Sequence, residues 1–383
     1  MKPFIKFFSS LELAIACMVL GLVLVFVGTL DQVHLGIHGA TERYFYSFFV
    51  MWEIPNSEVA IPYLPGGYTV GTTLLINLIT ALFTRFRFSW KKAGVLMIHF
   101  GVISLLIGEL VSSMMQVDSN MAIDEGATKN YSEDRTISEL VIIDHSHSTT
   151  TDRVYAFPKA MLKTNHDVRH EDLPFSISIN QFMTNSVIRK RDENTPSKSL
   201  IANKDIGLDY YAIETPKTGK MDEINRNTAN LTIFDSEGNV AGTWLASLAF
   251  PLQRFSFEGK DYSLQIRNKR YYHPFEIKLI DFSFDRYLGT NIPMNYSSMI
   301  ELTNYDTGEN REFLIYMNHP LRYSGLTFFQ SSFTPDELTT ILQVVSNPGR
   351  HLPYISCILI FAGLSFQFGF GLITFIGKRL KRS

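Results

Sequence analysis

Cysteine is scarce in this chain, and its scarcity excludes several classes of site. The 383 residues contain two cysteines, Cys17 and Cys357, and both lie in apolar segments. We therefore expect no disulfide framework, CxxC redox pair or cysteine zinc site. The sequence also has no GxSxG, HExxH or glycine-rich phosphate-binding motif, so it offers no convincing catalytic constellation.

Neither sign of charge is in excess, because 35 Lys and Arg residues oppose 37 Asp and Glu residues. The net charge of −2 gives no reason to expect nucleic acid as a partner. Hydrophobic residues make up 45% of the chain but are unevenly spread, with three apolar segments before residue 116 and one after residue 352. This distribution excludes a purely soluble enzyme, a disordered chain and a transporter with many spans.

Four apolar segments predict transmembrane helices at residues 11–30, 68–84, 93–115 and 353–376. About 20 apolar residues in a helix cross the hydrocarbon core of a bilayer, and membrane lipids are therefore expected around them. A signal peptide is the alternative for the first segment, because Lys2 and Lys6 precede it. Its long apolar run and the lack of a small-x-small cleavage site favour a membrane span.

Positively charged residues predict the orientation of these spans. They flank the segments in residues 1–10, 85–92 and 377–383, as Lys2, Lys6, Arg85, Arg87, Lys91, Lys92, Lys378, Arg379, Lys381 and Arg382. Since such residues accumulate on the cytoplasmic side, we expect both termini in the cytoplasm. Residues 31–67 and the large segment 116–352 then lie in the periplasm or another extracytoplasmic space. No transit peptide is evident, which favours a bacterial inner membrane over a plastid.

Residues 31–67 contain a cluster of aromatic residues, which predicts an anchor along the outer membrane surface. In the second apolar segment, Asn77 is expected to bond to a neighbouring helix. Glycines recur in the third and fourth segments, as expected where helices pack closely in lipid.

Residues 116–352 alternate between short β-rich runs and turn sequences, and they predict an antiparallel sandwich or open barrel. Turns are expected at residues 124–126, 235–239, 257–261 and 304–310. The polar residues 185–206 are interpreted as a flexible excursion. The predicted fold is thus a membrane protein with four transmembrane α-helices and a large, mainly β extracytoplasmic domain.

His99 is the most informative titratable residue, because it lies seven residues into the third apolar segment. An ionisable side chain at that depth needs a partner and marks a functional site by default. A neutral imidazole there could ligate a metal or haem iron. Equally, it could bond across to another helix, for instance to Asn77.

The other histidines are weaker candidates, and Glu109 is interpreted as an interfacial residue. The pairs are His34 and His38, His145 and His147, and His166 and His170. The first pair is expected at the membrane boundary, the second could be a weak metal pair lacking a third ligand, and the third pair is expected in an exposed loop.

Residues 317–333, MNHPLRYSGLTFFQSSF, resemble the hallmark segment of the ResB-like (CcsB) family of cytochrome c biogenesis proteins. In that family an N-x-P-L-R-Y-x-G stretch precedes an aromatic-Gln-Ser run. The matching positions are Asn318, Pro320, Leu321, Arg322, Tyr323, Gly325, Phe329, Gln330 and Ser331. The order of three spans, a large outer domain and a final span is also similar to the family's.

The resemblance implies export of haem b and its delivery to apocytochrome c for covalent attachment, in the pathway called System II. It implies a subunit of a cytochrome c synthase (haem lyase) complex rather than an enzyme acting alone. The implied partner is a CcsA/ResC-type membrane protein with a tryptophan-rich haem-handling segment. This chain has three tryptophans and no such segment. His99 matches the histidine of the third span that supplies an axial haem ligand in the family.

Arg322 is a candidate contact for a haem propionate, because a guanidinium group can hold a carboxylate with two hydrogen bonds. This role requires its loop to reach the membrane surface. The alternative is a buried turn that holds the β-domain together. For the whole chain, the alternatives are a non-enzymatic scaffold that binds apocytochrome, or a membrane-anchored sensor that binds no haem.

Overall fold

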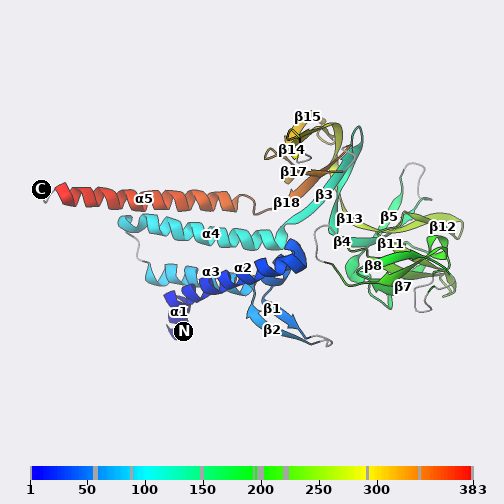
Figure 1. Cartoon of the computed structure of the whole chain (residues 1–383), viewed down its shortest axis with the longest axis horizontal. Helices are drawn as coiled ribbons and strands as arrows, with labels where there is room; N and C mark the ends of the chain where they lie inside the picture. The colour runs from blue at the N-terminus through cyan, green and yellow to red at the C-terminus, as the bar shows by residue number, and fades with distance from the viewer. Residues whose placement is uncertain are drawn as a thin grey trace. The chain divides into compact units, whose positions relative to one another are not determined.

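The computed structural model describes residues 2–54, 59–86, 89–146, 151–192, 195, 202–218, 224–289, 293–334 and 338–380. Of the residues singled out above, Arg87, His147, Lys381 and Arg382 lie outside this part of the chain. The chain forms two compact units (Figure 1). The first, here called the helical unit, comprises the residues up to Val117 and those from Ser346 onward. The second, the β unit, lies between Asp118 and Val345.

The helical unit contains a short helix, four long helices and a two-stranded hairpin. Their bounds are α1 (Lys2–Phe8), α2 (Leu11–Ala40), β1 (Phe49–Glu53), β2 (Ala60–Pro65), α3 (Gly67–Arg85), α4 (Ala93–Met115) and α5 (Leu352–Leu380). The four long helices are long and apolar enough to cross a membrane, which confirms the four expected from the sequence. Most of their large apolar side chains are exposed, as expected for helices surrounded by lipid.

The first long helix extends ten residues past its expected end at residue 30. It continues to Ala40 and into a π-helical turn at Thr41–Phe45. Gly36 has a non-helical backbone with φ 70° and ψ 171°, so a kink at Gly36 interrupts the helix, which resumes after it. The aromatic segment that follows contributes to an antiparallel β1–β2 hairpin, with Trp52 opposite Ile61.

Small residues bring α4 into close contact with the first half of α5 (Figure 1). A Cβ atom added at Gly94 would lie 2.6 Å from the carbonyl oxygen of Gly363, and one at Gly101 would lie 2.6 Å from Ile360 Cγ1. Gly94, Gly101 and Gly108 recur every seven residues, so they form one stripe along the helix. The expectation that these glycines mark close helix packing is confirmed for this stripe.

Asn77 of α3 is buried, and its amide nitrogen donates hydrogen bonds of 2.8 Å to the carbonyl oxygens of Phe8 and Ser10. These two carbonyls lie at the junction between α1 and α2, where the helical hydrogen-bond pattern is interrupted. The expected bond to a neighbouring segment is therefore present, and it fixes the start of the first long helix.

The β unit is built from antiparallel strands in three sheets of ten, four and two strands. The bounds are β3 (Val117–Asp124), β4 (Thr128–Asp144), β5 (Arg153–Pro158), β6 (His166–Val168), β7 (Ser176–Met183), β8 (Ser186–Lys190), β9 (Tyr210–Glu214), β10 (Thr228–Phe234), β11 (Val240–Ser247), β12 (Gln253–Phe257), β13 (Lys260–Arg286), β14 (Pro293–Asn304), β15 (Glu309–Tyr316), β16 (Leu321–Tyr323), β17 (Leu326–Phe333) and β18 (Thr339–Ser346). All four expected turns connect consecutive strands, at residues 124–126, 235–239, 257–261 and 304–310, and each contains a glycine with positive φ.

Most of the large sheet curls into a nearly closed barrel, in the order β15-β14-β13-β4-β3-β18-β17-β16. Its two ends meet through side chains and an isolated bridge. Asn304 donates a 2.9 Å hydrogen bond to the Tyr323 hydroxyl, which donates to Glu309 over 2.8 Å. His319 pairs with Tyr316 in the bridge. Of the two predicted arrangements, the open barrel describes this part of the chain.

The β unit has two main apolar cores. One fills the barrel and includes Met121, Phe275 and Phe328. The other, including Leu231 and Trp244, packs between the four-stranded sheet β11-β10-β7-β6 and the remaining parts of β4 and β13. The long strand β13 contributes to both cores and thereby joins them.

The interpretation of residues 185–206 as a flexible excursion is wrong for Ser186–Lys190. These residues form β8, which pairs with β9 from Ser186 opposite Glu214 to Lys190 opposite Tyr210. The charged residues that follow the segment NSVIRK obscure its alternation, and the pairing strand begins twenty residues after β8 ends.

Candidate functional site

His99 lies in α4 with its side chain half-buried, and its Nδ1 atom is 2.8 Å from the carbonyl oxygen of Val95. A carbonyl oxygen can only accept, so Nδ1 carries the proton and donates this bond. In the neutral imidazole, Nε2 then keeps its lone pair. This is the tautomer that can coordinate a metal through Nε2, with the ring orientation fixed by the bond to Val95.

The glycine stripe and His99 lie on different faces of α4. Successive residues of an α-helix are about 100° apart, so His99 lies about 140° around the helix from Gly94. Because Gly94 and Gly101 contact α5, the imidazole is directed away from that helix. The Nε2 atom forms no hydrogen bond with another side chain in the described part of the chain.

The alternative in which His99 bonds to Asn77 is wrong. Both hydrogen bonds of the Asn77 amide nitrogen go to carbonyls at the junction of α1 and α2, and His99 bonds within its own helix. The sequence could not distinguish these arrangements, because interhelical bonding depends on how each helix is rotated about its axis.

Arg322 lies in the β unit, on the short strand β16, and its side chain is exposed. The hairpin to β17 turns through Ser324 and Gly325, which have φ angles of 49° and 80°. Leu321 on one side of Arg322 is buried in the barrel core, and Tyr323 on the other is hydrogen-bonded across the barrel seam. The hallmark segment therefore closes the barrel, while the guanidinium group of Arg322 points away from the core.

Gln330 of the same segment lies in a polar cluster between three strands. Its amide nitrogen donates a 2.9 Å hydrogen bond to Thr340 Oγ1, and its Oε1 atom is 2.7 Å from the hydroxyl of Ser298. Ser298 and Thr340 are both fully buried and lie 2.8 Å apart. This arrangement satisfies hydroxyl groups that would otherwise be buried without partners.

His145 forms the polar contacts nearest to a catalytic arrangement. Its Nδ1 atom is 3.0 Å from Asp152 Oδ1, and its Nε2 atom is 2.6 Å from Ser263 Oγ. The contacts from Ser263 through His145 to Asp152 resemble the catalytic triad of a Ser-His-Asp hydrolase. However, Ser263 is fully buried, so its hydroxyl cannot reach a substrate. The contacts instead attach the residue-145 turn to β13.

The remaining histidines do not form a metal site in the described part of the chain, where no cluster of three suitable ligands occurs. His34 and His38 are exposed and are separated by the bend at Gly36. His166 lies on strand β6, so the helical spacing to His170 is not realised, and the His170 ring packs against Tyr155.

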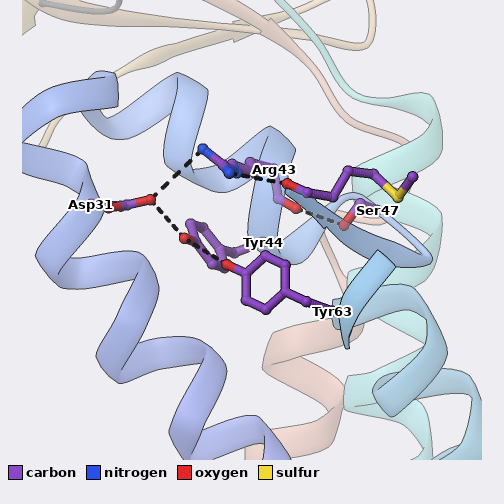
Figure 2. A network of polar contacts seen from close by, with 6 residues as sticks. Asp31, Arg43, Tyr44, Ser47 and Tyr63 are labelled. Atoms are coloured by element: carbon purple, nitrogen blue, oxygen red, sulfur yellow. Dashed lines mark hydrogen bonds and ion pairs between the residues drawn. The ribbon is translucent and has the colours of Figure 1, made fainter. Parts of the chain in front are cut away.

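A polar network near the end of α2 was not anticipated from the sequence (Figure 2). Tyr44 is 1% exposed, and its hydroxyl donates a 2.6 Å hydrogen bond to Asp31 and lies 3.3 Å from the hydroxyl of Tyr63. Arg43 lies 3.9 Å from Asp31 and donates to the carbonyl oxygen of Met51 over 3.0 Å. The network attaches the β1–β2 hairpin to α2. Asp31, which directly follows the apolar segment 11–30, was the only sequence feature that pointed to this network.

Comparison with known proteins identifies the domain that carries the hallmark segment. Residues 256–341 match the ResB-like family. A stretch of 91 residues is 37% identical to Protein NrfI of Wolinella succinogenes. That stretch covers 24% of this chain and 10% of NrfI, so the similarity concerns a small part of that relative. The family match runs from β12 to β18 and includes the Gln330 cluster and the Arg322 hairpin. Residues 256–341, which form most of the barrel strands, are therefore similar to the ResB-like family.

Proposed function

We propose that this chain acts in cytochrome c biogenesis by binding haem b in the membrane through His99 and passing it on for attachment to apocytochrome c. The ResB-like family is linked to cytochrome c biogenesis, and the family match supports this role. The observation that carries the proposal is the hydrogen bond from His99 Nδ1 to Val95, which leaves Nε2 available as a ligand.

The surroundings of His99 suit haem as a transported substrate. The ring of haem needs an apolar slot, and the iron needs an axial imidazole. His99 lies in a helix whose composition is otherwise apolar over most of its length. In this proposal the chain positions the imidazole and excludes water, while the haem iron supplies the coordination chemistry.

Besides His99, the four long apolar helices contain only His34 and His38, near the end of α2. A second axial ligand would therefore come from a partner. We propose a CcsA/ResC-type membrane protein as this partner, so that the chain is a subunit of a cytochrome c synthase complex. The positive charges around the spans support cytoplasmic termini and an extracytoplasmic β unit, in a bacterial inner membrane. His99 would then lie toward the cytoplasmic side, where haem is captured.

Replacing His99 with Ala tests the proposal. The complex, purified in detergent with a co-expressed CcsA/ResC-type partner, is expected to lose the sharp absorption bands of reduced haem, and added imidazole is expected to restore them. His34→Ala is the matched control, because His34 is an exposed histidine on another helix. Full haem occupancy in the His99→Ala complex would refute the ligand assignment.

A scaffold role for the β unit is the second candidate, and the closed barrel seam favours it. The hallmark residues hold the barrel together, which suits a rigid surface for apocytochrome. This candidate predicts that surface variants of the barrel block cytochrome c maturation while the haem spectrum of the complex is unchanged. Glu312→Lys is one such variant, because Glu312 is exposed on β15, whereas Arg322→Glu would also remove the candidate propionate contact.

A further inference from the structure

A cavity of about 250 Å³ lies within the helical unit, between the π-helical turn Thr41–Phe45, α3 and α4. Its lining includes Phe45, Tyr46, Tyr68, Gly71, Leu106 and Glu109. The lining is mainly apolar, and Glu109 is its one titratable carboxylate, without a Lys, Arg or His side chain among the described lining residues. The cavity therefore carries a single negative charge in an apolar setting.

The carboxylate of Glu109 has no hydrogen bond or ion pair within the described part of the chain. It lies six residues before the end of α4, about 9 Å along the helix axis. A charged group within an apolar span costs free energy unless it finds a partner, and a glutamate side chain is shorter than the lysine and arginine side chains that reach the membrane surface. Its side chain is exposed, so a molecule bound from outside this chain can reach it.

Two other hydroxyl groups of the cavity lining are already bonded within their own helices. The Thr72 hydroxyl donates to the carbonyl oxygen of Tyr68, and the Ser113 hydroxyl donates to that of Leu110. These bonds lie within the helices. Glu109 thus remains the acceptor available to a bound molecule, and it selects a group that donates hydrogen bonds or carries positive charge.

Two tyrosine rings in the cavity lining also favour binding of an ammonium group. The rings of Tyr46 and Tyr68 stack with their centroids 6.0 Å apart and an interplanar angle of 13°. Aromatic faces attract cations, and a neighbouring carboxylate adds to this attraction. Because the described lining has no cationic side chain, it does not suit acidic headgroups or haem propionates. Leu106 and the open space above Gly71 leave room for an acyl chain.

We propose that this cavity binds the headgroup of phosphatidylethanolamine, with its primary ammonium group on the carboxylate of Glu109. The phosphate group then extends toward water, and one acyl chain follows the apolar surface of α4. A concave cavity of this volume fits a lipid headgroup better than a basic side chain on the convex surface of another helix. The site is independent of haem binding, because Glu109 and His99 are ten residues, about 15 Å, apart along α4.

The test uses the purified full-length chain in detergent, titrated with dihexanoyl phosphatidylethanolamine, phosphatidylcholine or phosphatidylglycerol while its thermal unfolding is followed. The ethanolamine lipid is expected to raise the unfolding temperature at the lowest concentration, because its ammonium group can donate hydrogen bonds to a carboxylate. The choline lipid has no such donor and is expected to bind more weakly. The glycerol lipid, which is anionic, is expected to have no effect.

Two variants and two controls connect the effect to the cavity. Glu109→Gln is expected to raise the half-saturating concentration of the ethanolamine lipid about tenfold, through loss of a charge-assisted hydrogen bond. Gly71→Leu is expected to remove the effect by filling the cavity without changing its charge. Glu42→Gln, on an exposed side chain, and Gly21→Leu, at an unobstructed position of α2, are the matched controls.

Unchanged binding of the ethanolamine lipid by Glu109→Gln would overturn the proposal, as would equal stabilisation by the glycerol lipid. If Glu109→Gln instead released a co-purifying membrane protein while lipid binding was unchanged, the carboxylate would pair with a basic residue of that partner, and the proposal would fall. None of these outcomes depends on the haem spectrum of the complex.

Discussion

The amide nitrogen of Gln330 donates a 2.9 Å hydrogen bond to Oγ1 of Thr340, which joins β17 to β18 inside the barrel. The hydroxyl of Ser298, on β14, lies within 2.8 Å of both partners. These three strands come from both ends of the curled sheet. The Gln330 position of the family segment thus has a structural role that is separate from haem chemistry.

Replacing Gln330 with Leu is expected to lower the free energy of unfolding of the β unit by about 1–3 kcal/mol, because Ser298 and Thr340 lose a partner while buried. Urea unfolding of the full-length chain, followed by circular dichroism in the β-sheet region, measures this change. Arg322→Ala, on the exposed side of the same hairpin, is the control and should change stability by less than about 0.5 kcal/mol. Equal stability of both variants would contradict the structural role.

Gly94→Ala is expected to separate α4 from α5. The added Cβ would lie 2.6 Å from the carbonyl oxygen of Gly363 and 2.9 Å from the backbone nitrogen of Gln367, so the backbone itself must move. The unfolding temperature in detergent should fall. Gly21→Ala, which meets no atom within 4 Å, is the control and should raise it slightly because alanine favours helix.

Arg267 and Glu139 form a buried ion pair across β13 and β4, with Nε and Oε1 3.0 Å apart and side chains 9% and 10% exposed. Glu139→Ala should reduce the free energy of unfolding by about 3–5 kcal/mol, since it leaves an unpaired buried guanidinium group. The double variant Glu139→Leu, Arg267→Met should recover most of this loss. Removal of the exposed Asp172–Arg153 pair by Asp172→Ala should cost less than about 1 kcal/mol.

His273 is expected to make the stability of the β unit depend on pH. Burial lowers the pKa of His273 below its ordinary value of 6.5, and its Nε2 atom lies 3.1 Å from the hydroxyl of Ser132. Between the lowered pKa and 6.5, the unfolded chain binds more protons than the folded chain. The stability contributed by neutral His273 is therefore complete above pH 6.5 and is lost as the pH falls below it.

His273→Gln should flatten this dependence, because glutamine can still accept from Ser132 but does not titrate. Unfolding midpoints in urea measured from pH 7.5 to pH 5 would compare the two proteins, and the carboxylates contribute equally to both. An identical pH profile for the two proteins would show that His273 does not control this part of the stability curve.

Local sequence features predicted the helices and most turns correctly. The four spans follow from apolar run length, and the turns at residues 235–239 and 304–310 follow from a glycine within a short stretch that also contains Asp and Asn. These signals are contained in short stretches, because a bilayer-spanning helix satisfies its own backbone hydrogen bonds and a tight turn needs a residue that tolerates positive φ. The sequence did not predict that α2 continues beyond Gly36, because a glycine at that position is compatible with either a kink or the end of a helix.

The sequence by itself determined that the chain has four membrane-length apolar helices, a β-rich domain and a histidine within one helix. Tertiary structure alone decided that His99 bonds to Val95 and not to Asn77, that Gln330 is inside the barrel seam, and that Glu109 lines a cavity. It also placed Tyr44 against Asp31 and Tyr63. Hydropathy and turn chemistry act between near neighbours, whereas these contacts depend on helix rotation and strand order, which bring together residues far apart in the sequence.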